Sequence, residues 1–480
     1  MKKINKIIIS VMVIAIVVIS LIILLGNFLW TKNKNAVITP LQSIKNTARL
    51  IKDASYFFEH SQGTYLFILQ NSDELRPTGG FIGTYGLVTV EAGRITNFFT
   101  DDVYNLDKLA PKQTRPPAPE PIKKYLEQPY WYLRDANWNP DFPTSAKQIL
   151  KFYEEESEFQ PKNTIHDNIA GVIAIDPEAI RPLLKLVGPI EAGGETFSAD
   201  NLTDLLEYEV EVGFDSKGIS PLQRKAIISE LGDKLIAKVM DLSLSRRAEV
   251  VNMVQSALNE KHILAYARDA EVQAALELQG WSGSIKNAPL DYFAVFDANM
   301  FAMKTDPYVQ KNIFYNVHKK GEALIGELEI VYAYPKAGPA WKTKGYRTWT
   351  RVYVPKGSIL QSAGGAMLTE QSMQPGNVVV EQENEKTVFG AFVALQVGEE
   401  KHLKFIYRLP NYINQAVALG NYELLAQKQP GTLGHNLTIT ADLGKVVKQW
   451  TPSEPGIKQD GTKLIWQTSL KKDQMIKIGF

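Results

Sequence analysis

The sequence predicts an α/β (α+β) ectodomain with a mixed sheet and covering helices, followed by a C-terminal all-β sandwich, on a single N-terminal transmembrane helix. Three observations lead to this prediction. An uncharged apolar run opens the chain, strand and helix patterns alternate through its middle, and strands with a period of two fill the region after about residue 305. Beyond the apolar run, roughly 450 residues exceed what one compact core holds, so several domains are expected.

The apolar run extends from Ile7 to Trp30 without a charged residue. As a helix it is long enough to cross about 30 Å of hydrocarbon. Lys2, Lys3 and Lys6 precede it without an acid, which favours a cytoplasmic N-terminus. A cleaved signal peptide is the alternative, but the run is longer than a usual signal-peptide core and no A-x-A site follows it. We therefore expect a single-pass signal anchor in the cytoplasmic membrane, with the rest of the chain outside.

Composition excludes several classes of function. The chain has 53 basic and 52 acidic residues, and without the three lysines that precede the apolar run the balance is 50 to 52. No overall basic field exists to recruit nucleic acid. The absence of cysteine excludes disulfides, thiolate metal sites and a cysteine nucleophile, and for an exported protein it fits a bacterial envelope. No metalloprotease, serine-hydrolase or Walker A motif is present.

The expected organisation follows from the order of these patterns. The domains are residues 1–31 (cytoplasmic stub and anchor), 32–62 (a stalk helix), 63–304 (the α/β domain) and 305–480 (the β-sandwich). In the α/β domain we expect strands at 65–69, 85–90, 95–99 and 170–175, helices at 145–153, 177–186, 221–242, 245–261 and 268–278, and an irregular proline-rich surface loop at 111–129.

The least ordinary segment connects the first two of these strands, from Asn71 to Gly83. Its glycines allow backbone N–H groups to converge on an anion, and Arg76 can add a bidentate contact to a phosphate or carboxylate. Asp73 and Glu74 offer oxygen ligands to a divalent cation such as Mg²⁺. The alternative is a tight strand connection that is held by an internal ion network. The candidate residues of this segment are Asp73, Glu74, Arg76, Thr78, Gly79 and Gly80.

A second concentration of polar and aromatic residues spans 132–143, directly after the proline-rich loop. If this segment forms the rim of a binding groove, Trp138 can stack on a sugar ring or cover an apolar ligand. The candidates are Arg134, Asp135, Asn137, Trp138 and Asp141, with Asp135 as a candidate base. A ligand-free, hydrogen-bonded loop is the alternative. Asp101, Asp102 and Asp107 form an acidic cluster after the hairpin. This cluster indicates either a solvated turn or a metal site, for which Asp73, Asp101 and Asp102 are the candidate ligands.

These strings resemble a known family. The segment from Asn71 through Val90, the segment from Leu133 to Pro143, Lys261-His262 followed by Trp281-Ser282-Gly283, and the strand from Tyr346 to Pro355 are similar to domain-of-unknown-function family 4012. The likeness covers most of the ectodomain, and the family name implies no activity.

The order of elements also resembles the LytR-CpsA-Psr envelope proteins, which transfer lipid-pyrophosphate-linked glycopolymers to the cell wall. Ser72-Asp73, the segment from Ala170 to Pro189, and Gln223-Arg224 carry the likeness. It departs at Asp101-Asp102 and at 208–211, where acids stand in place of that family's arginines. An anion would therefore have to be bound by Arg76 and Arg134, with Arg224 as a further candidate.

Two functions remain open from the sequence. The first is a non-catalytic structural or binding role at the cell surface. The second is a transferase or binder of anionic, lipid-linked glycopolymer intermediates, with Asp73, Arg76, Arg134 and Asp135 as the catalytic set and Mg²⁺ as cofactor. The expected partners are the membrane and a lipid-linked glycan or cell-wall polymer, and not nucleic acid.

Overall fold

A computed structural model describes residues 63–91, 94–160, 168–372 and 374–480. The predicted anchor and stalk helix lie outside these residues. Within the described part of the chain, no helix is both long and apolar enough to cross a membrane.

The first sheet has five strands in the order β3-β2-β1-β4-β7. β1 pairs antiparallel with β2 and parallel with β4, and β7 is antiparallel to β4, so the sheet is mixed as predicted. The strand β7 was not indicated by the sequence analysis. The bounds are β1 Gly63–Asn71, β2 Phe81–Glu91, β3 Arg94–Asp102, β4 Ile169–Ile175 and β7 Ile263–Ala267.

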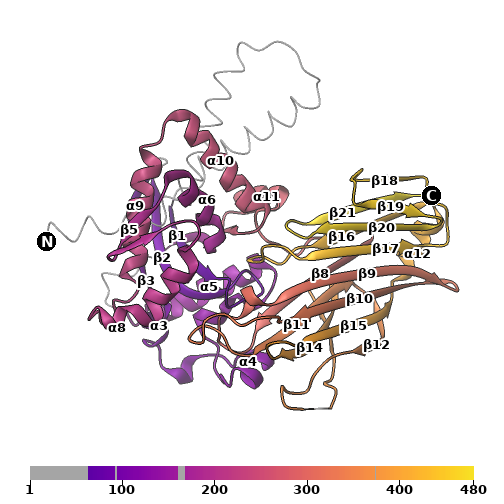
Figure 1. Cartoon of the computed structure of the whole chain (residues 1–480), viewed down its shortest axis with the longest axis horizontal. Coiled ribbons are helices and arrows are strands. Elements are labelled where there is room, and N and C mark those ends of the chain that lie inside the picture. The colour runs from indigo at the N-terminus through magenta and orange to yellow at the C-terminus, as the bar shows by residue number, and fades with distance from the viewer. Residues whose placement is uncertain (1–62, 92–93, 161–167, 373) are drawn as a thin grey trace, which may run out of the picture.

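Helices cover both faces of this sheet (Figure 1). Successive side chains of a strand point to opposite faces, so Tyr65 and Phe67 of β1 pack against one helical layer, and Leu66 and Ile68 against the other. The first layer contains α6 (Pro177–Val187), α7 (Leu202–Tyr208), α9 (Ala226–Met240) and α10 (Leu244–Asn259), and the second α3 (Val103–Asp107), η3 (Leu133–Trp138) and α5 (Phe142–Ser157). The predicted N-cap Asp176 begins α6 by accepting a hydrogen bond from the Glu178 N–H.

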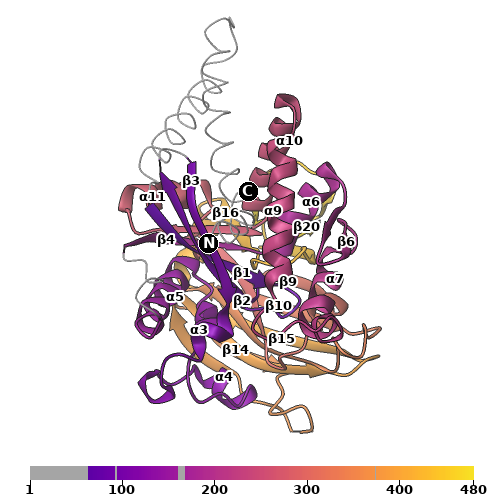
Figure 2. The ribbon, with the colours of Figure 1, turned by 90° about the vertical axis from the view of Figure 1, so that its left-hand side faces the viewer.

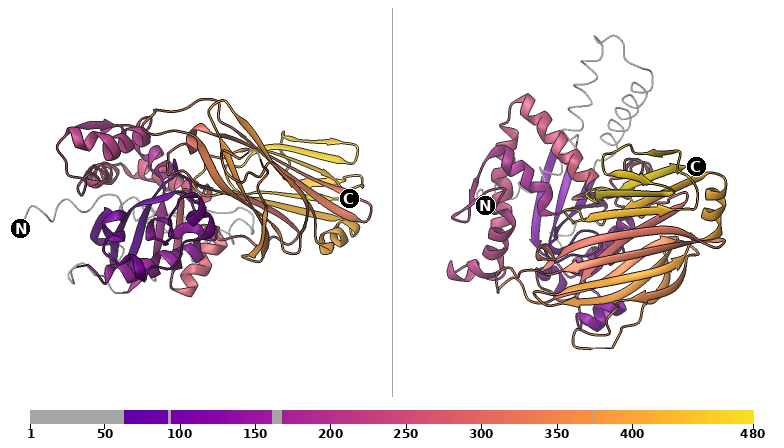
Figure 3. Two further views of the ribbon diagram at one scale, coloured as in Figure 1. Left: turned by 90° about the horizontal axis from the view of Figure 1, so that it is seen from below. Right: turned by 45° about the vertical axis from the view of Figure 1, so that its right-hand side comes forward.

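The C-terminal strands form two seven-stranded sheets that pack face to face (Figure 3). Phe293 of one sheet lies 4.9 Å from Tyr315 of the other, and Phe389 lies 5.7 Å from Phe405, between ring centroids. One sheet contains, in order, β13 Val379–Glu383, β14 Lys386–Leu395, β11 Tyr346–Pro355, β8 Asp291–Asn299, β16 Asn421–Gln427, β21 Gln474–Gly479 and β18 Gln449–Thr451. The other contains β12 Ile359–Gly364, β15 Glu400–Arg408, β10 Ala323–Ala333, β9 Gln310–Lys320, β17 Asn436–Asp442, β20 Lys463–Ser469 and β19 Ile457–Asp460.

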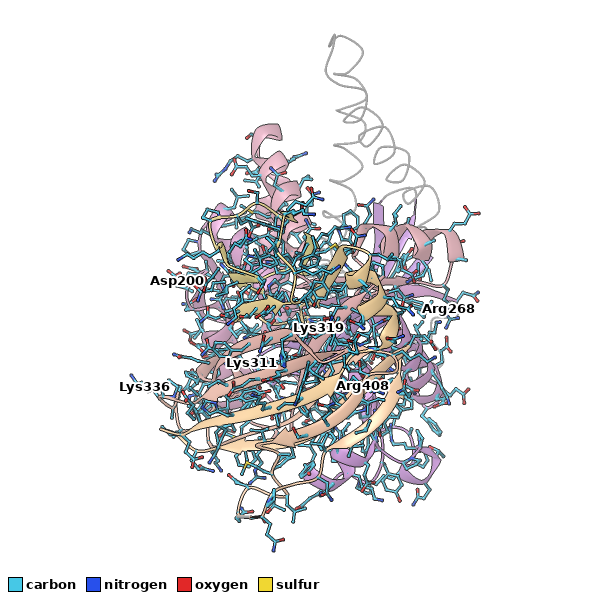
Figure 4. The ribbon with its side chains drawn as sticks, turned by 90° about the vertical axis from the view of Figure 1, so that its right-hand side faces the viewer. Asp200, Arg268, Lys311, Lys319, Lys336 and Arg408 are labelled. Carbon is cyan, nitrogen blue, oxygen red and sulfur yellow. The ribbon has the colours of Figure 1, made fainter. Side chains whose placement is uncertain are left out.

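Figure 4 looks onto this sandwich from its outer side, where Lys319, Lys336 and Arg408 are exposed. The strand-rich C-terminal region is therefore confirmed. The predicted domain boundary at 304/305 stays a prediction, although β8, which the sequence analysis did not indicate, already belongs to the sandwich.

The connection between β1 and β2 joins the α/β unit to the sandwich. Leu75 exchanges backbone and side-chain hydrogen bonds with the C-terminal unit: its carbonyl accepts from the Asn299 N–H at 2.9 Å, and its N–H donates to Asp306 Oδ2 at 3.1 Å. A Cβ on Gly431 would lie 1.9 Å from the carbonyl oxygen of Gly79, so the β16–β17 loop approaches this connection as closely as only glycine allows. The segment that the sequence marked as unusual is thus an interface.

Two of the expected elements were wrong in detail. The proline-rich stretch contains a short helix, α4 (Glu120–Tyr125), and it is not merely a solvated loop, because Ile122 is buried and the Tyr125 ring stacks on Phe392 of the sandwich at 4.0 Å. The helix expected from residue 221 begins at Ala226, because residues 221–225 form a turn.

The interface predicts a pH dependence of stability. Burial raises the pKa of Asp306 to about 7, so between about pH 4 and pH 7 the folded state holds a proton that the unfolded state has released. Stability from this group is therefore lost as pH rises through that window. We expect the melting temperature of Asp306→Asn to rise relative to the wild type between about pH 5 and pH 8. Asp460→Asn, at an exposed position, is the control, and equal pH profiles for wild type and Asp306→Asn would contradict the assignment.

Candidate functional site

Arg76 lies at the centre of the β1–β2 connection with only 1% of its surface exposed. Its Nε donates to Asp135 at 3.0 Å and its Nη2 to Glu74 at 3.0 Å. Its Nη1 lies 3.2 Å from the carbonyl oxygens of Leu75 and Asn299. Burial disfavours the charged form, but the two carboxylates outweigh it and raise the pKa of Arg76 above its ordinary value. The guanidinium is thus fully engaged within the protein.

The neighbouring candidates hold the connection in shape. The Gln70 side chain donates to the Thr78 carbonyl and accepts from the Thr78 hydroxyl, while Asn137 Nδ2 donates to Gln70 Oε1 at 2.8 Å and to the Gly80 carbonyl at 2.7 Å. Gly79 has a φ of +138°, with the Gln70 side chain against its Cα. These contacts correspond to the structural alternative that the sequence left open for both segments.

The remaining candidates of the second segment also make internal contacts. Asp141 is the N-cap of α5 and accepts from the Thr144 N–H. The Trp138 ring lies 4.6 Å from the Arg351 guanidinium of the sandwich. Arg134 pairs with Asp107 at 2.6 Å but remains partly exposed. Asp135 is 1% exposed and bound to Arg76.

A cavity of about 600 Å³ opens between the sheet and the helical layer of α6, α7 and α9. Its volume is in the range of pockets that bind small molecules. Its apolar walls contain Val210 and seven side chains from the core of that layer: Leu69, Ile180, Leu202, Leu206, Ile228, Leu231 and Leu235. The segment Glu209–Gly213 that forms part of the wall is a π-helix, η4, a form often found at functional sites.

A basic cluster lies at one edge of this cavity, and three basic side chains share two carboxylates there. Asp102 accepts from Arg224 at 3.2 Å and from Lys225 at 2.9 Å, and Glu211 accepts from Arg224 at 3.1 Å and from Lys304 at 3.0 Å. Lys304 comes from the C-terminal unit, so both units build this edge. With every group ionised, the basic cluster carries one net positive charge.

The pKa shifts of these groups follow from the same contacts. Burial opposes ionisation of Asp102, but Lys225 outweighs it, so the pKa of Asp102 lies below its ordinary value. Burial likewise opposes ionisation of Glu211, and the charge of Lys304 reverses the effect and lowers the pKa of Glu211. The pKa of Lys225 is lowered by burial. An added anion at this edge would favour the charged form of Lys225.

Five predicted site residues line the cavity: Glu74, Arg76, Asp102, Arg134 and Arg224. The others do not: Asp73, Thr78, Gly79, Gly80, Asp101, Asp135, Asn137, Trp138 and Asp141. Asp101 accepts hydrogen bonds from the Asp102 N–H and from Asn105 at the start of α3.

A group of three carboxylates, Asp73, Asp204 and Glu207, lies close enough to share one cation. The Lys342 ammonium occupies this position, at 2.6 Å from Asp73, 2.6 Å from Asp204 and 2.8 Å from Glu207, with 1% of the lysine side chain exposed. Burial, and next the charge of Asp73, raise the pKa of Glu207 to about 7. Asp73 therefore lies with these two acids and not in the predicted set with Asp101 and Asp102, and a lysine of the sandwich supplies the positive charge.

Sequence reasoning missed Lys225, Lys304, Lys342 and the apolar walls of the cavity. Lys225 adjoins the Gln223-Arg224 pair that the resemblance had pointed out, so it was within reach. Lys342 lies 138 residues from Asp204, and the sequence around Lys342 contains no motif from which its acidic partners can be predicted.

The comparisons with known proteins give a family match and no characterised relative. The family model "Protein of unknown function (DUF4012)" matches residues 61–210, which supports that resemblance for this part of the chain. No curated protein matches.

Among solved structures, a suspected nutrient binding protein of Legionella pneumophila shares 9% identity over 39% of this chain and 71% of its own, with a TM-score of 0.24. Leukotriene A4 hydrolase of Saccharomyces cerevisiae shares 10% over 36% of this chain and 29% of its own, with a TM-score of 0.22. An M1 zinc metallopeptidase of Deinococcus radiodurans shares 10% over 35% and 42%, with a TM-score of 0.21. No argument about this chain rests on likenesses this low.

The contacts of Arg76 predict a large loss of stability on substitution. In Arg76→Met, the buried carboxylates of Glu74 and Asp135 lose the guanidinium that they bind. Removing one partner of a buried ion pair lowers the free energy of unfolding by about 3–5 kcal/mol. We expect a lower melting temperature for the full-length protein in detergent. Arg76→Met combined with Glu74→Gln and Asp135→Asn removes the uncompensated charges, and we expect it to recover part of the loss. A melting temperature unchanged in Arg76→Met would contradict the structural role.

Proposed function

We propose that this chain is a membrane-anchored, extracytoplasmic envelope protein whose α/β unit binds an amphiphile with an apolar chain and an anionic head, without catalysing its conversion. The ligand class that fits this description is the lipid-linked phosphate or pyrophosphate intermediate of envelope glycopolymers. The signal anchor expected at Ile7–Trp30 supplies the localisation in this proposal.

The observation that supports this proposal best is the pairing of an apolar cavity with the basic cluster in one site. Walls such as Leu206 and Leu231 favour an alkyl or isoprenoid chain because they remove apolar surface from water on binding. Arg224 and Lys304 stand at the same edge, with 19% and 16% of their side chains exposed, where a head group can reach them. Arginine in particular matches phosphate oxygens with two parallel donors.

This assignment moves the anion-binding role within the site. The sequence analysis gave it to Arg76 and Arg134, with Arg224 as a further candidate, whereas the geometry favours Arg224 together with Lys225 and Lys304. The resemblance to LytR-CpsA-Psr proteins supports the same ligand class in the proposal, since Gln223-Arg224 is one of the segments that carry it.

The non-catalytic version is favoured by the state of the candidate catalytic residues. Asp135 and Arg76 are buried against each other, and the carboxylates that approach one another closely enough for a metal are held by Lys342. Other acids that line the cavity are also paired with cations: Glu211 with Arg224 and Lys304, and Glu207 with Lys342.

Head-group recognition predicts a loss of affinity in the double variant Arg224→Gln/Lys304→Gln. Asp102 keeps Lys225 as a partner and Glu211 is exposed enough to be hydrated, so we expect the fold to tolerate it. Full-length protein in phosphatidylcholine nanodiscs is titrated with farnesyl diphosphate. Each lost charge-assisted hydrogen bond is worth about 1.5–3 kcal/mol, so we expect an affinity at least about tenfold weaker.

Arg268→Gln is the matched control, because Arg268 lies at the opposite edge of the α/β unit from the start of α7 near Asp200 (Figure 4). Uncharged farnesol should bind wild type and double variant equally. Farnesyl diphosphate binding that is absent in the wild type, or unchanged in the double variant, would overturn the proposed function.

The apolar part of the site is tested separately by Ile228→Trp, which places a larger side chain in the wall formed by α9. We expect weaker binding of farnesyl diphosphate and unchanged binding of inorganic diphosphate, because only the chain meets the indole. Lys234→Trp places the same indole on the exposed side of α9 and should leave both affinities unchanged. Equal binding of farnesyl diphosphate by wild type and Ile228→Trp would exclude this wall as the chain site.

A further inference from the structure

Two of the segments that line the cavity also carry exposed apolar side chains. Among the described side chains that precede β8, seven large apolar ones are exposed. Two of these seven, Phe159 and Leu278, are on segments that do not line the cavity. The other five fall on the two segments that contribute Lys108 and residues 206–225 to the cavity, and we name them the apolar rim: Leu109, Tyr208, Val212, Ile219 and Leu222.

The apolar rim continues directly into the cavity. Leu222 is 69% exposed and also lines the cavity, so one side chain belongs to both surfaces. Arg224, two residues after Leu222, pairs with Asp102 at the start of α3 (Val103–Asp107), so Leu222 lies near the segment that ends in Leu109. Clustered apolar side chains in water are costly unless a partner covers them.

Exposed lysines accompany this rim. Lys108 and Lys112 flank Leu109, and both are exposed, while the segment from Tyr208 to Leu222 has exposed Glu211 and Asp215 as well as exposed Lys217. Apolar side chains with lysines beside them are typical of surfaces that enter the head-group region of a bilayer, where the apolar groups reach the acyl chains and the ammonium groups meet lipid phosphates. The lysines beside Leu109, together with the anchor expected at Ile7–Trp30, favour a bilayer as the partner of this surface.

The length of chain that precedes the fold permits this contact. Residues 31–62 separate the charge-free run that ends at Trp30 from the start of β1 at Gly63. These 32 residues reach about 100 Å when extended and about 48 Å as the stalk helix that the sequence predicts. The rim lies near the far end of β1, where Asn71 bonds Glu207, and a strand of nine residues spans about 30 Å. In Figure 2 the strands lead from the end at which the described chain begins down to α3. Residues 31–62 are thus long enough for the apolar rim to reach the membrane that holds the anchor.

We propose that the apolar rim inserts into the outer surface of the membrane that carries the anchor, so that the cavity opens onto lipid. The identity of the ligand rests on the proposed function, but insertion of the rim does not need a ligand. In this arrangement the apolar chain of a membrane lipid enters the cavity from the bilayer without crossing water, while its head group meets Arg224 and Lys304.

The absence of cysteine makes a direct test simple, because any single cysteine substitution labels one site only. Leu109→Cys, Val212→Cys and Leu222→Cys in the full-length protein each receive a nitroxide, as do the controls Phe159→Cys and Leu278→Cys. The proteins are reconstituted without ligand into vesicles of phosphatidylcholine and phosphatidylglycerol. Accessibility of each label to lipid-dissolved oxygen and to a water-soluble nickel chelate is then measured.

We expect the three rim labels to lose nickel accessibility and gain oxygen accessibility relative to both controls. Rim labels as accessible to nickel as the controls would overturn the proposal. Shielding of the rim labels with dipolar broadening between copies would also overturn it, since a second copy of the chain would then cover the rim. Because no ligand is present, this result is independent of the binding of farnesyl diphosphate, and each proposal fails on its own measurement.

Discussion

The buried ion network of Arg76 is the interaction on which the rest of the structure depends. One guanidinium bonds two carboxylates of the α/β unit and a backbone carbonyl of the sandwich, Asn299, at the point where the two units meet. Burying these charges is costly, and their mutual contacts offset the cost only when the geometry of all partners is kept. The network therefore specifies the relative position of the two units as much as it stabilises either one, and the edge of the cavity is built across that same junction.

The cavity results from how the helices cover the sheet. β1 gives Tyr65 and Phe67 to the layer of α6, α9 and α10, and Leu69 of the same face reaches the cavity at the end of the strand. There α7, the π-helix that follows and the turn at 221–225 line a space that side chains leave unfilled. The apolar face that forms a core farther along the strand is thus left open at its end, next to basic side chains.

Much of the fold follows from local sequence. The strands at 65–69 and 170–175, the Asp176-Pro177 start of α6 and the period-two pattern of the sandwich depend on neighbours within a few residues, and they were predicted. The site was predicted less well because its residues meet through long-range contacts. Arg76 stood out by its glycine-rich setting, which turned out to serve close packing against Gly431 and an internal ion network. Lys304 pairs with Glu211, 93 residues earlier, and Lys342 with Asp204, 138 residues earlier, and no local pattern marks such pairs.

Lys342 has a consequence for where a self-sufficient folding unit can end. The ammonium group that neutralises Asp73, Asp204 and Glu207 belongs to the connection between β10 and β11, far beyond the stretch 61–210 that the family model matches. The matched stretch also lacks β7 at the edge of its own sheet and the helices α9 and α10 that cover it. Excised at those limits, it would carry three acids without their counter-ion and an uncovered apolar sheet face. The region that recurs as a sequence family is therefore only a fragment of the physical unit, and the sandwich completes the charge balance of the segment that precedes it.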